Sequence, residues 1–415
     1  MNSSQNPLRL HVVLLSAFAL LGGAACASDG GEPSVEGEDS ESGSSDDNFT
    51  AGPKLNLPSE TDTTSSLAGL PLDASSEKND AFVDIRGLGD SGWSESKHPL
   101  PATFGETLDK FGNAYRGDLS FINWETVVGE SCNTWGSASF YFVSKSENLN
   151  QLYQRGFNLI GNANNHARDC AKGPDASGAL VSGELMTASN MAAASTGKTW
   201  LWAGVGKGDP TDTKLQTFTI KGKQITVALG SGYFGSARTC ANSVCATQVE
   251  SAMQKVLATK AQIRIFALHC MEVGDPKYCN SEVTSAGQRF IELGGDVVFG
   301  HGPHVWRPVY VVRKKAGTST NGSATGVLFQ SLGNGAHPAL SDQSKNYIGR
   351  ALLNLSDLKL RQVQILPIRN YREGSAPERK GRIAFSSVPL SEVEGNVKLT
   401  LHPEKSTAGF VNVKP

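Results

Sequence analysis

The sequence predicts an α/β fold, a four-layer sandwich in which two mixed β-sheets are flanked by helices. Two observations lead to this expectation. From about residue 80 onward, predicted strands alternate with predicted helices, which favours a mixed α/β sheet. After Pro308 the remaining segments are mostly strands. Sheet-forming segments at both ends, with helices between them, indicate two packed sheets inside helical layers.

The first part of this region supplies alternating elements. Residues 118–124 (Asp-Leu-Ser-Phe-Ile-Asn-Trp) and 296–299 (Asp-Val-Val-Phe) are short apolar runs, which are typical of buried strands. Further strands are expected at 81–88, 157–162 and 262–268, and helices at 103–111, 146–155, 175–189, 248–260 and 282–293. This order predicts that helices connect most neighbouring strands.

A hairpin and a run of late strands complete the pattern. Residues 215–220 and 224–229 flank Lys221-Gly222-Lys223, a spacing that predicts a β-hairpin. The last strands are expected at 309–313, 327–332, 349–355 and 362–368. We therefore expect a single folded domain over 79–370, followed by a β-rich extension over 371–415.

The N-terminus has the pattern of an export signal. Arg9 precedes an apolar stretch, 10–21, that is too short for a comfortable membrane span. Small residues then lead to Cys26, so 1–26 resembles a bacterial lipoprotein signal whose cysteine is lipidated. Ordinary cleavage within Ala25-Cys26-Ala27 would also fit, and would give a secreted protein. Either route places the mature chain outside the cytoplasm, in the cell envelope facing the periplasm or exterior when it is lipid-anchored.

Residues 27–78 are expected to be a disordered tether. Ser, Gly, Thr and acidic residues dominate, and eight acids lie between Asp29 and Asp47. Such a composition buries too little apolar surface to offset the entropy of ordering. The full chain has a net charge of −2 and lacks a basic stripe with interleaved aromatics, which argues against a nucleic-acid partner.

Six cysteines follow Cys26. In an exported protein this number allows three disulfides, and sequence alone cannot choose among fifteen connectivities. The spacing favours two short loops, Cys240–Cys245 and Cys270–Cys279, which leaves Cys132–Cys170. A zinc cluster is less favoured because no pair has the C-x-x-C spacing.

The segment Gly300-His301-Gly302-Pro303-His304 is the strongest functional signal. It follows the apolar run 296–299, so two histidines lie on a glycine- and proline-stiffened loop at the end of a predicted strand. Such a loop holds two imidazoles close together with little freedom, which suits a metal site. A surface turn that contains histidines by chance is the alternative.

Other polar groups also follow predicted strands. They are Asp90, Glu125 with its neighbour Asn123, the run Asn164-Asn165-His166, and His269. If the strands are parallel, these groups share one sheet edge, where α/β proteins place their sites. Taken singly, Asp90 is more typical of a turn and His269 of a buried hydrogen-bonded histidine. Together they indicate an oxygen and nitrogen site suited to Mn, Fe or Zn.

The ordered segments Asp-Ile-Arg-Gly-Leu-Gly-Asp, Asn-Trp-Glu, Ala-Asn-Asn-His, Leu-His, Gly-His-Gly-Pro-His and Ser-Leu-Gly-Asn resemble those of the CapA family. This capsule-synthesis family, also called poly-γ-glutamate biosynthesis proteins, belongs to the calcineurin-like metallophosphoesterase superfamily. The resemblance covers roughly 81–334. It implies a two-sheet sandwich flanked by helices, as the pattern of elements already predicts.

The resemblance also implies roles for individual residues. Asp90, Glu125, Asn165, His269, His301 and His304 would be the metal ligands, and the centre would hold two divalent ions. His166 would be the general acid or a supporting residue beside the ligand Asn165, and Asp169 would orient it. Asn334 would lie nearby.

Departures from catalytic phosphoesterases, which CapA proteins generally share, bear on activity, and one further departure is specific to this chain. The D-x-H motif of catalytic phosphoesterases is absent, since Asp90 is followed by Ser91-Gly92, and Glu125 replaces the usual bridging aspartate. Gly302 stands where the family has a histidine. Pairing of Cys132 with Cys170 would clamp two site loops together.

The resemblance and the motifs leave the reaction open. One hypothesis is a metal-dependent hydrolase of a phosphoester, active in capsule polymer synthesis or anchoring. The alternative is a non-catalytic lipoprotein that binds an anionic capsule polymer on a degenerate scaffold, held to the membrane through its N-terminal lipid.

Overall fold

The computed structural model describes residues 80–95, 103–109, 111–134, 141–235, 242–270, 276–337 and 345–372, and three strands at 383–387, 401–405 and 411–413. The predicted signal peptide, the lipidation site Cys26 and the predicted tether lie outside the described residues. None of the described helices is long and apolar enough to cross a membrane.

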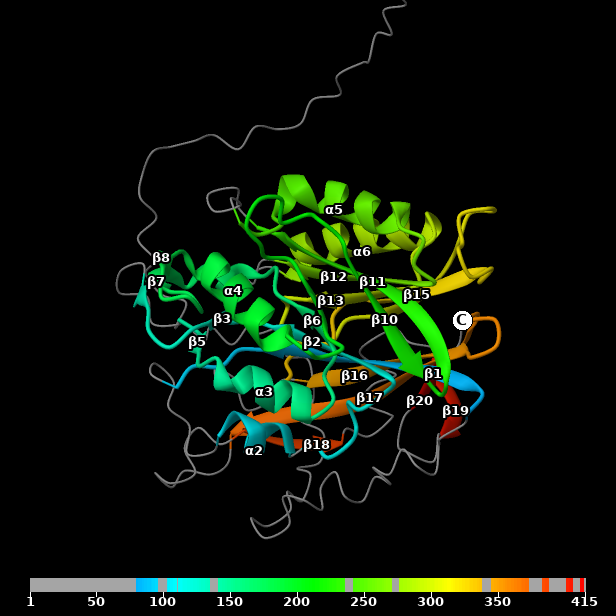
Figure 1. Ribbon diagram of the computed structural model, residues 1–415. Helices are drawn as coiled ribbons and strands as arrows, with labels where there is room; N and C mark the ends of the chain where they lie inside the picture. The colour runs from blue at the N-terminus through cyan, green and yellow to red at the C-terminus, as the bar shows by residue number, and fades with distance from the viewer. Residues whose placement is uncertain are drawn as a thin grey trace, which may run out of the picture. The chain divides into compact units, whose positions relative to one another are not determined.

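Two large sheets form the centre of the folded region (Figure 1). Among the described residues, the first sheet has nine strands in the order β19-β20-β17-β16-β1-β2-β6-β9, with β18 paired to β17. Its strands are β1 (Phe82–Ser91), β2 (Leu119–Trp124), β6 (Leu159–Gly161), β9 (Leu201–Ala203), β16 (Lys345–Asn354), β17 (Leu360–Arg372), β18 (Ile383–Ser387), β19 (Leu401–Lys405) and β20 (Val411–Val413). The described part of 371–415 therefore extends this sheet.

The second sheet has six described strands in the order β10-β11-β12-β13-β15-β14. They are β10 (Lys214–Ile220), β11 (Lys223–Phe234), β12 (Ile263–Cys270), β13 (Val297–His301), β15 (Thr325–Phe329) and β14 (Val309–Arg313). The predicted β10–β11 hairpin is confirmed. Lys221 and Gly222 both have positive φ, 48° and 80°, which two-residue hairpin turns of type I′ require.

Helices cover the outer faces of both sheets, so the predicted α/β sandwich is confirmed. Figure 1 shows α5 (Ala246–Ala258) and α6 (Pro276–Glu292) over the second sheet, and α2 (Phe104–Asp109) and α3 (Glu147–Gln154) beside the first. The helix α4 (Gly183–Ser195) packs on the same side as α3. Thr103 and Glu106 form a reciprocal capping box at the start of α2, which explains why the helix begins there.

Three apolar clusters lie between the four layers. One joins the two sheets, one joins the first sheet to α2, α3 and α4, and one joins the second sheet to α5 and α6. Strand β12 contributes to two of them, because Ile263, Ile265 and Ala267 face the central cluster while Phe266 and Leu268 face the helices. This alternation explains why the strand is apolar on both faces.

The predicted helix at 175–189 is wrong in its first half. Strands β7 (Cys170–Pro174) and β8 (Leu180–Val181) pair there, and α4 begins only at Gly183. The Asp175 carboxylate accepts hydrogen bonds from the backbone N–H groups of Ser177 and Ala179. This local turn competes with helix formation, as short acidic side chains commonly do.

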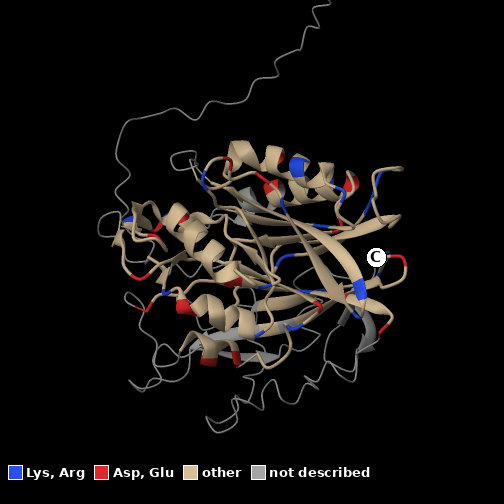
Figure 2. Cartoon of the chain, in the orientation of Figure 1, with Lys and Arg blue, Asp and Glu red and all other residues tan. Residues whose placement is uncertain are grey.

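Charged residues are mixed in sign over this part of the chain. Figure 2 shows Lys and Arg positions among Asp and Glu positions along the same helices and strands.

Candidate metal centre

The carboxyl ends of parallel strands meet at one edge and gather the predicted ligands. Strands β1, β2 and β6 run parallel in the first sheet, and β11, β12 and β13 run parallel in the second. Asp90 lies near the end of β1, Glu125 directly follows β2, and His269 and His301 lie at the ends of β12 and β13. The expected convergence at strand ends is therefore confirmed, but the residues come from the two sheets of the sandwich and not from one sheet edge.

A bulge in β1 positions Asp90. The pairing with β2 passes from Leu88–Ile122 directly to Asp90–Asn123, so Gly89 is the extra residue. Bulges of this kind redirect a side chain near functional sites. The fully buried Asp90 carboxylate accepts hydrogen bonds from Asn123 Nδ2 at 2.7 Å and from the Gly302 N–H at 3.0 Å.

Two buried histidines flank this carboxylate. His269 and His301 are paired residues on neighbouring strands, with ring centroids 6.4 Å apart. The distances from their Nδ1 atoms to Asp90 Oδ1 are 3.7 Å and 3.5 Å. His269 Nε2 also lies 3.5 Å from Glu125 Oε1. Two carboxylates and two imidazoles therefore converge in a space closed to solvent.

The loop after β13 brings His304 to the same place. Gly302 has φ +109°, and a Cβ there would lie 2.3 Å from the Cys270 carbonyl oxygen, so the loop in this conformation requires glycine. His304 has φ 53°, a left-handed conformation that non-glycine residues adopt only occasionally. Its Nδ1 lies 2.6 Å from Asn334 Oδ1 and 3.3 Å from Asp90 Oδ2.

The tautomer of His304 follows from this contact. An amide oxygen only accepts hydrogen bonds, so Nδ1 of His304 carries the hydrogen and Nε2 keeps its lone pair. Metal-binding histidines are commonly oriented in this way by a hydrogen bond to the other ring nitrogen. The expectation that Asn334 lies nearby is confirmed, and its role is to orient His304.

His337 is a site residue that the sequence analysis did not identify. Glu125, His304 and His337 each offer a ligand atom, and these atoms lie within 4.8 Å of one another. His337 Nε2 is 3.7 Å from Glu125 Oε2, and its ring centroid is 5.0 Å from that of His304. The only sequence signal was its position, three residues after Asn334 in a chain with eight histidines.

The Asn-Asn-His run opens the 3₁₀ helix η2 (Asn165–Arg168) beside this cluster. Asn164, part of the predicted polar run although not of the predicted ligand set, donates to the Trp124 carbonyl at 3.1 Å and approaches Asn123 Oδ1 at 3.4 Å. Asn165 follows it at the start of η2 and is partly buried. Its role as a ligand stays a prediction.

Asp169 holds His166, as expected. His166 Nδ1 is 2.6 Å from Asp169 Oδ2, and the same oxygen accepts the Phe142 N–H at 2.6 Å. The Phe142 ring packs edge-on against His166 at 4.5 Å and against His337 at 5.0 Å. One aromatic ring therefore separates the His166–Asp169 pair from the Glu125, His304 and His337 group.

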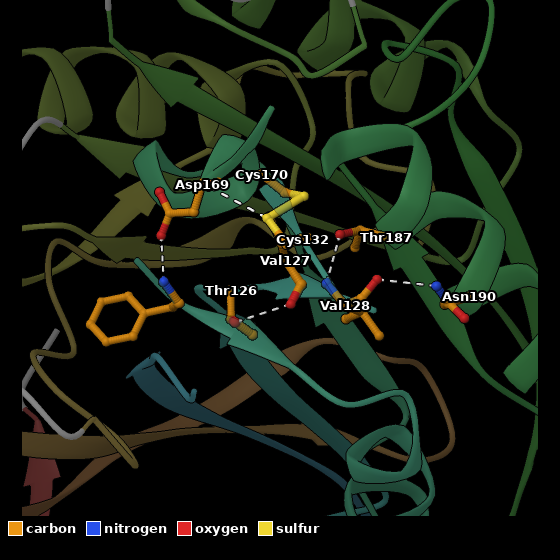
Figure 3. The surroundings of a disulfide bond; sticks show 9 residues. Thr126, Val127, Val128, Cys132, Asp169, Cys170, Thr187 and Asn190 are labelled. Atoms are coloured by element: carbon orange, nitrogen blue, oxygen red, sulfur yellow. Dashed lines mark hydrogen bonds between the residues drawn. A yellow bond between two sulfur atoms is a disulfide. The ribbon is translucent and has the colours of Figure 1, made fainter. Parts of the chain in front are cut away.

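A disulfide anchors this part of the site. Cys132 and Cys170 are bonded, the pairing expected from the sequence, and Figure 3 shows the bond beside Asp169. Cys132 Sγ contacts the Asp169 carbonyl. Cys245 and Cys270 are each disulfide-bonded, whereas the side chains of their predicted partners, Cys240 and Cys279, lie outside the described residues.

The electrostatics favour an anionic Asp90 and a neutral His301. Burial pushes the pKa of Asp90 upward, but the hydrogen bond from His304 and the charge of His269 hold this pKa below its usual range. Burial lowers the pKa of His301 to about 3, against the opposing influence of Asp90. His301 is therefore neutral near pH 7 and has a lone pair to offer.

These residues fit a divalent metal. Both ring nitrogens of His301 are buried, and neither makes a hydrogen bond with the described residues. The Oδ1 atom of Asn164 is likewise buried and makes no hydrogen bond with them. Buried polar atoms normally have partners, so nitrogen and oxygen lone pairs gathered beside two buried carboxylates indicate a cation site. Carboxylate, amide and imidazole donors suit Mn, Fe or Zn.

Comparison with known proteins places the chain in a family. The model of the family described as "Bacterial capsule synthesis protein PGA_cap" matches residues 89–337. The chain belongs to this capsule synthesis family. The matched range contains every residue of the site described above, from Asp90 to His337. No curated protein matches the chain.

Two solved structures resemble this PGA_cap family member distantly. One is titled as a novel phosphatase from Mycoplasma pneumoniae, with 10% identity and a TM-score of 0.42, covering 69% of this chain and 94% of the other. The second is a hypothetical protein from Thermus thermophilus, with 11% identity and a TM-score of 0.36, covering 74% and 98%. Similarity at this level carries no information about activity.

Proposed function

We propose that the site is a metal-dependent hydrolase centre of the phosphoesterase type, and that the protein acts in synthesis or anchoring of an anionic capsule polymer such as poly-γ-glutamate. The observation that carries the hydrolase proposal is the buried convergence of Asp90 and Glu125 with neutral His301. A protein gains nothing in stability from burying two carboxylates beside bare imidazole lone pairs unless a cation joins them.

The metal ligands would be divided between two ions. Asp90, His269 and His301 surround one region, while Glu125 lies between His269 and the His304 ring. Two divalent cations bound there would neutralise charge on a phosphoryl oxygen and make a bound water more acidic. Asn165 is proposed as a further ligand, on the basis of the resemblance.

His166 would serve as the proton donor. Asp169 accepts from Nδ1, so Nε2 is the atom that exchanges a proton with the substrate. A side-chain exposure of 12% for His166 leaves this ring a route to solvent. The carboxylate stabilises the charged ring and fixes its orientation, which is the role of an acid partner in comparable pairs.

The test is metal content followed by turnover. Purified full-length protein should contain about two divalent ions per chain, and the variant His301→Ala, His304→Ala should lose them. The loaded wild type should hydrolyse an aryl phosphomonoester or phosphodiester, and His166→Gln should not. A wild type that binds no divalent metal would overturn the proposal.

A second candidate function is capture of the polymer without cleavage. Membership of a capsule synthesis family favours this candidate. The chemistry also allows it, because bound cations would attract the carboxylates of a polymer as well as phosphates. A metal-loaded protein that retains poly-γ-glutamate on a column and turns over no phosphoester would support this candidate.

We also propose that the chain is exported and anchored through a lipid on Cys26, with secretion as the alternative. Labelling with a radioactive fatty acid in cells, compared with Cys26→Ala, separates the two. Label on the wild type alone supports the anchor.

A further inference from the structure

The ring of His337 fills the space beside Gly92, two residues after Asp90. A Cβ built on Gly92 would lie 3.0 Å from both Cδ2 and Nε2 of His337 and 3.3 Å from Phe142 Cδ2. These distances are shorter than ordinary contact, so the imidazole of His337 occupies the volume into which a side chain at position 92 would project. The backbone of Gly92 is not in the left-handed region, so nothing in its conformation demands glycine.

Backbone hydrogen bonds hold the His337 loop against this strand end. The Asp90 N–H donates to the Gly333 carbonyl at 2.8 Å, and the Gly335 N–H donates to the Asp90 carbonyl at 2.6 Å. The Ala336 N–H donates to Ser91 Oγ at 3.2 Å. These contacts fix the loop over β1 independently of the His337 side chain.

The His337 ring is buried and aimed at the carboxylate. Its side chain is 5% exposed, and Nε2 lies 3.7 Å from Glu125 Oε2. The Phe142 ring packs edge-on on one side and the His304 ring on another. The distance to Glu125 is longer than a hydrogen bond and is compatible with both atoms binding the same ion.

We propose that His337 is a metal ligand, supplied from the loop after β15 into the space beside Gly92. Together with Glu125 and His304 it completes the ligand set for one of the two ions. Gly92 belongs to the same arrangement, because any larger residue there would displace the ring. This inference rests on the proposed metal centre and extends it to a residue outside the ligand set predicted from the sequence.

The inference is tested with full-length protein and Co²⁺ as the probe. His337→Phe keeps the aromatic packing and removes the lone pair. It should bind about one Co²⁺ fewer than wild type, or bind one ion more than about 100-fold more weakly, a loss larger than a residue that only orients a ligand produces. His337→Ala should show the same loss.

The decisive variant moves the imidazole. In Gly92→His combined with His337→Gly, a ring reaches the same space from the residue that follows β1, and Co²⁺ stoichiometry and the Co²⁺ absorption spectrum should return toward wild type. Restoration supports the inference. A His337→Phe variant that keeps wild-type stoichiometry, affinity and spectrum overturns it.

Two controls distinguish a metal ligand from a ring that only packs. If His337→Phe and His337→Ala both lower the melting temperature of the chelator-treated protein as much as that of the loaded protein, the ring acts in packing and the inference fails. The His166 ring also contacts Phe142, so His166→Gln is the control for changed packing around that ring and should keep its Co²⁺. A wild type without metal refutes the proposed function itself, whereas a loaded wild type with a fully loaded His337→Phe refutes only this inference.

Discussion

Asp90→Asn separates what the central carboxylate does for stability from what it does for metal binding. The two side chains have the same shape, but the amide has one acceptor oxygen and one NH₂ donor. In the structure both oxygens of Asp90 accept, Oδ1 from Asn123 and Oδ2 from the Gly302 N–H. Whichever way the new amide points, its NH₂ faces one of these donors.

The expected loss follows from these two contacts. A hydrogen bond to a charged group contributes about 1.5–3 kcal/mol, and a buried unsatisfied donor costs about 1–3 kcal/mol. We expect the metal-free variant to lose roughly 3–5 kcal/mol, which is about 6–20 °C in melting temperature for a domain of this size. Relief of burying the charge does not cancel this loss, because the surroundings hold the pKa of Asp90 below its usual range.

The assay is thermal unfolding by circular dichroism in excess chelator, over a range of pH. A depressed pKa stabilises the fold above the unfolded-state pKa of about 4, and this contribution disappears as pH falls further. The difference between wild type and Asp90→Asn should therefore shrink below about pH 4. Asp212→Asn, at a side chain 72% exposed, is the matched control and should melt like wild type. A metal-free Asp90→Asn that also melts like wild type would refute the stabilising role assigned to these two hydrogen bonds.

Three further outcomes are expected. Burial against the Trp202 ring lowers the pKa of Lys214 to about 8. Wild type should therefore gain stability relative to Lys214→Met as pH rises from 8 toward 10.5. Equal dependence of the unfolding free energy on pH in the two proteins, measured by chemical denaturation, would contradict this. Cys132→Ala opens a disulfide that spans 38 residues and should lower the unfolding free energy by about 2–4 kcal/mol in urea; an unchanged midpoint would argue against it. His166→Gln should lower phosphoester turnover about 10²–10⁴-fold with metal content unchanged. Asp169→Asn should lower turnover by a smaller factor, also with metal content unchanged. Loss of metal in either variant would show that the His166–Asp169 pair acts in metal binding instead.

The convergence of the strand-borne candidate residues could be predicted because two local signals sufficed. Asp90, Glu125, His269 and His301 each end or directly follow an apolar run, and parallel strands bring such positions together. His337 lacks that signal. Its place depends on backbone hydrogen bonds between its loop and β1, which the pattern of side chains does not encode.

Local turn chemistry limited the prediction of elements in a similar way. The helical pattern before α4 was overridden by the Asp175 turn that joins β7 to β8. Short strands such as β9 escaped prediction because three residues show no usable period. The order and type of the long elements were predictable, since central strands such as β1, β2, β12 and β13 are buried on both faces.

The difference between strand-borne and loop-borne residues explains how the rest of the site is built. Strand neighbours keep His269 and His301 in register without further support. His166 and His337 lie on irregular segments, and sites on loops are positioned less tightly unless other contacts hold them. The structure supplies those contacts locally, through the Cys132–Cys170 bond beside Asp169 and through the hydrogen bonds that fasten the 333–337 loop to β1. A disulfide persists only in an oxidising compartment, so the geometry around the His166–Asp169 pair would depend on export, whereas that of the strand-borne residues would not.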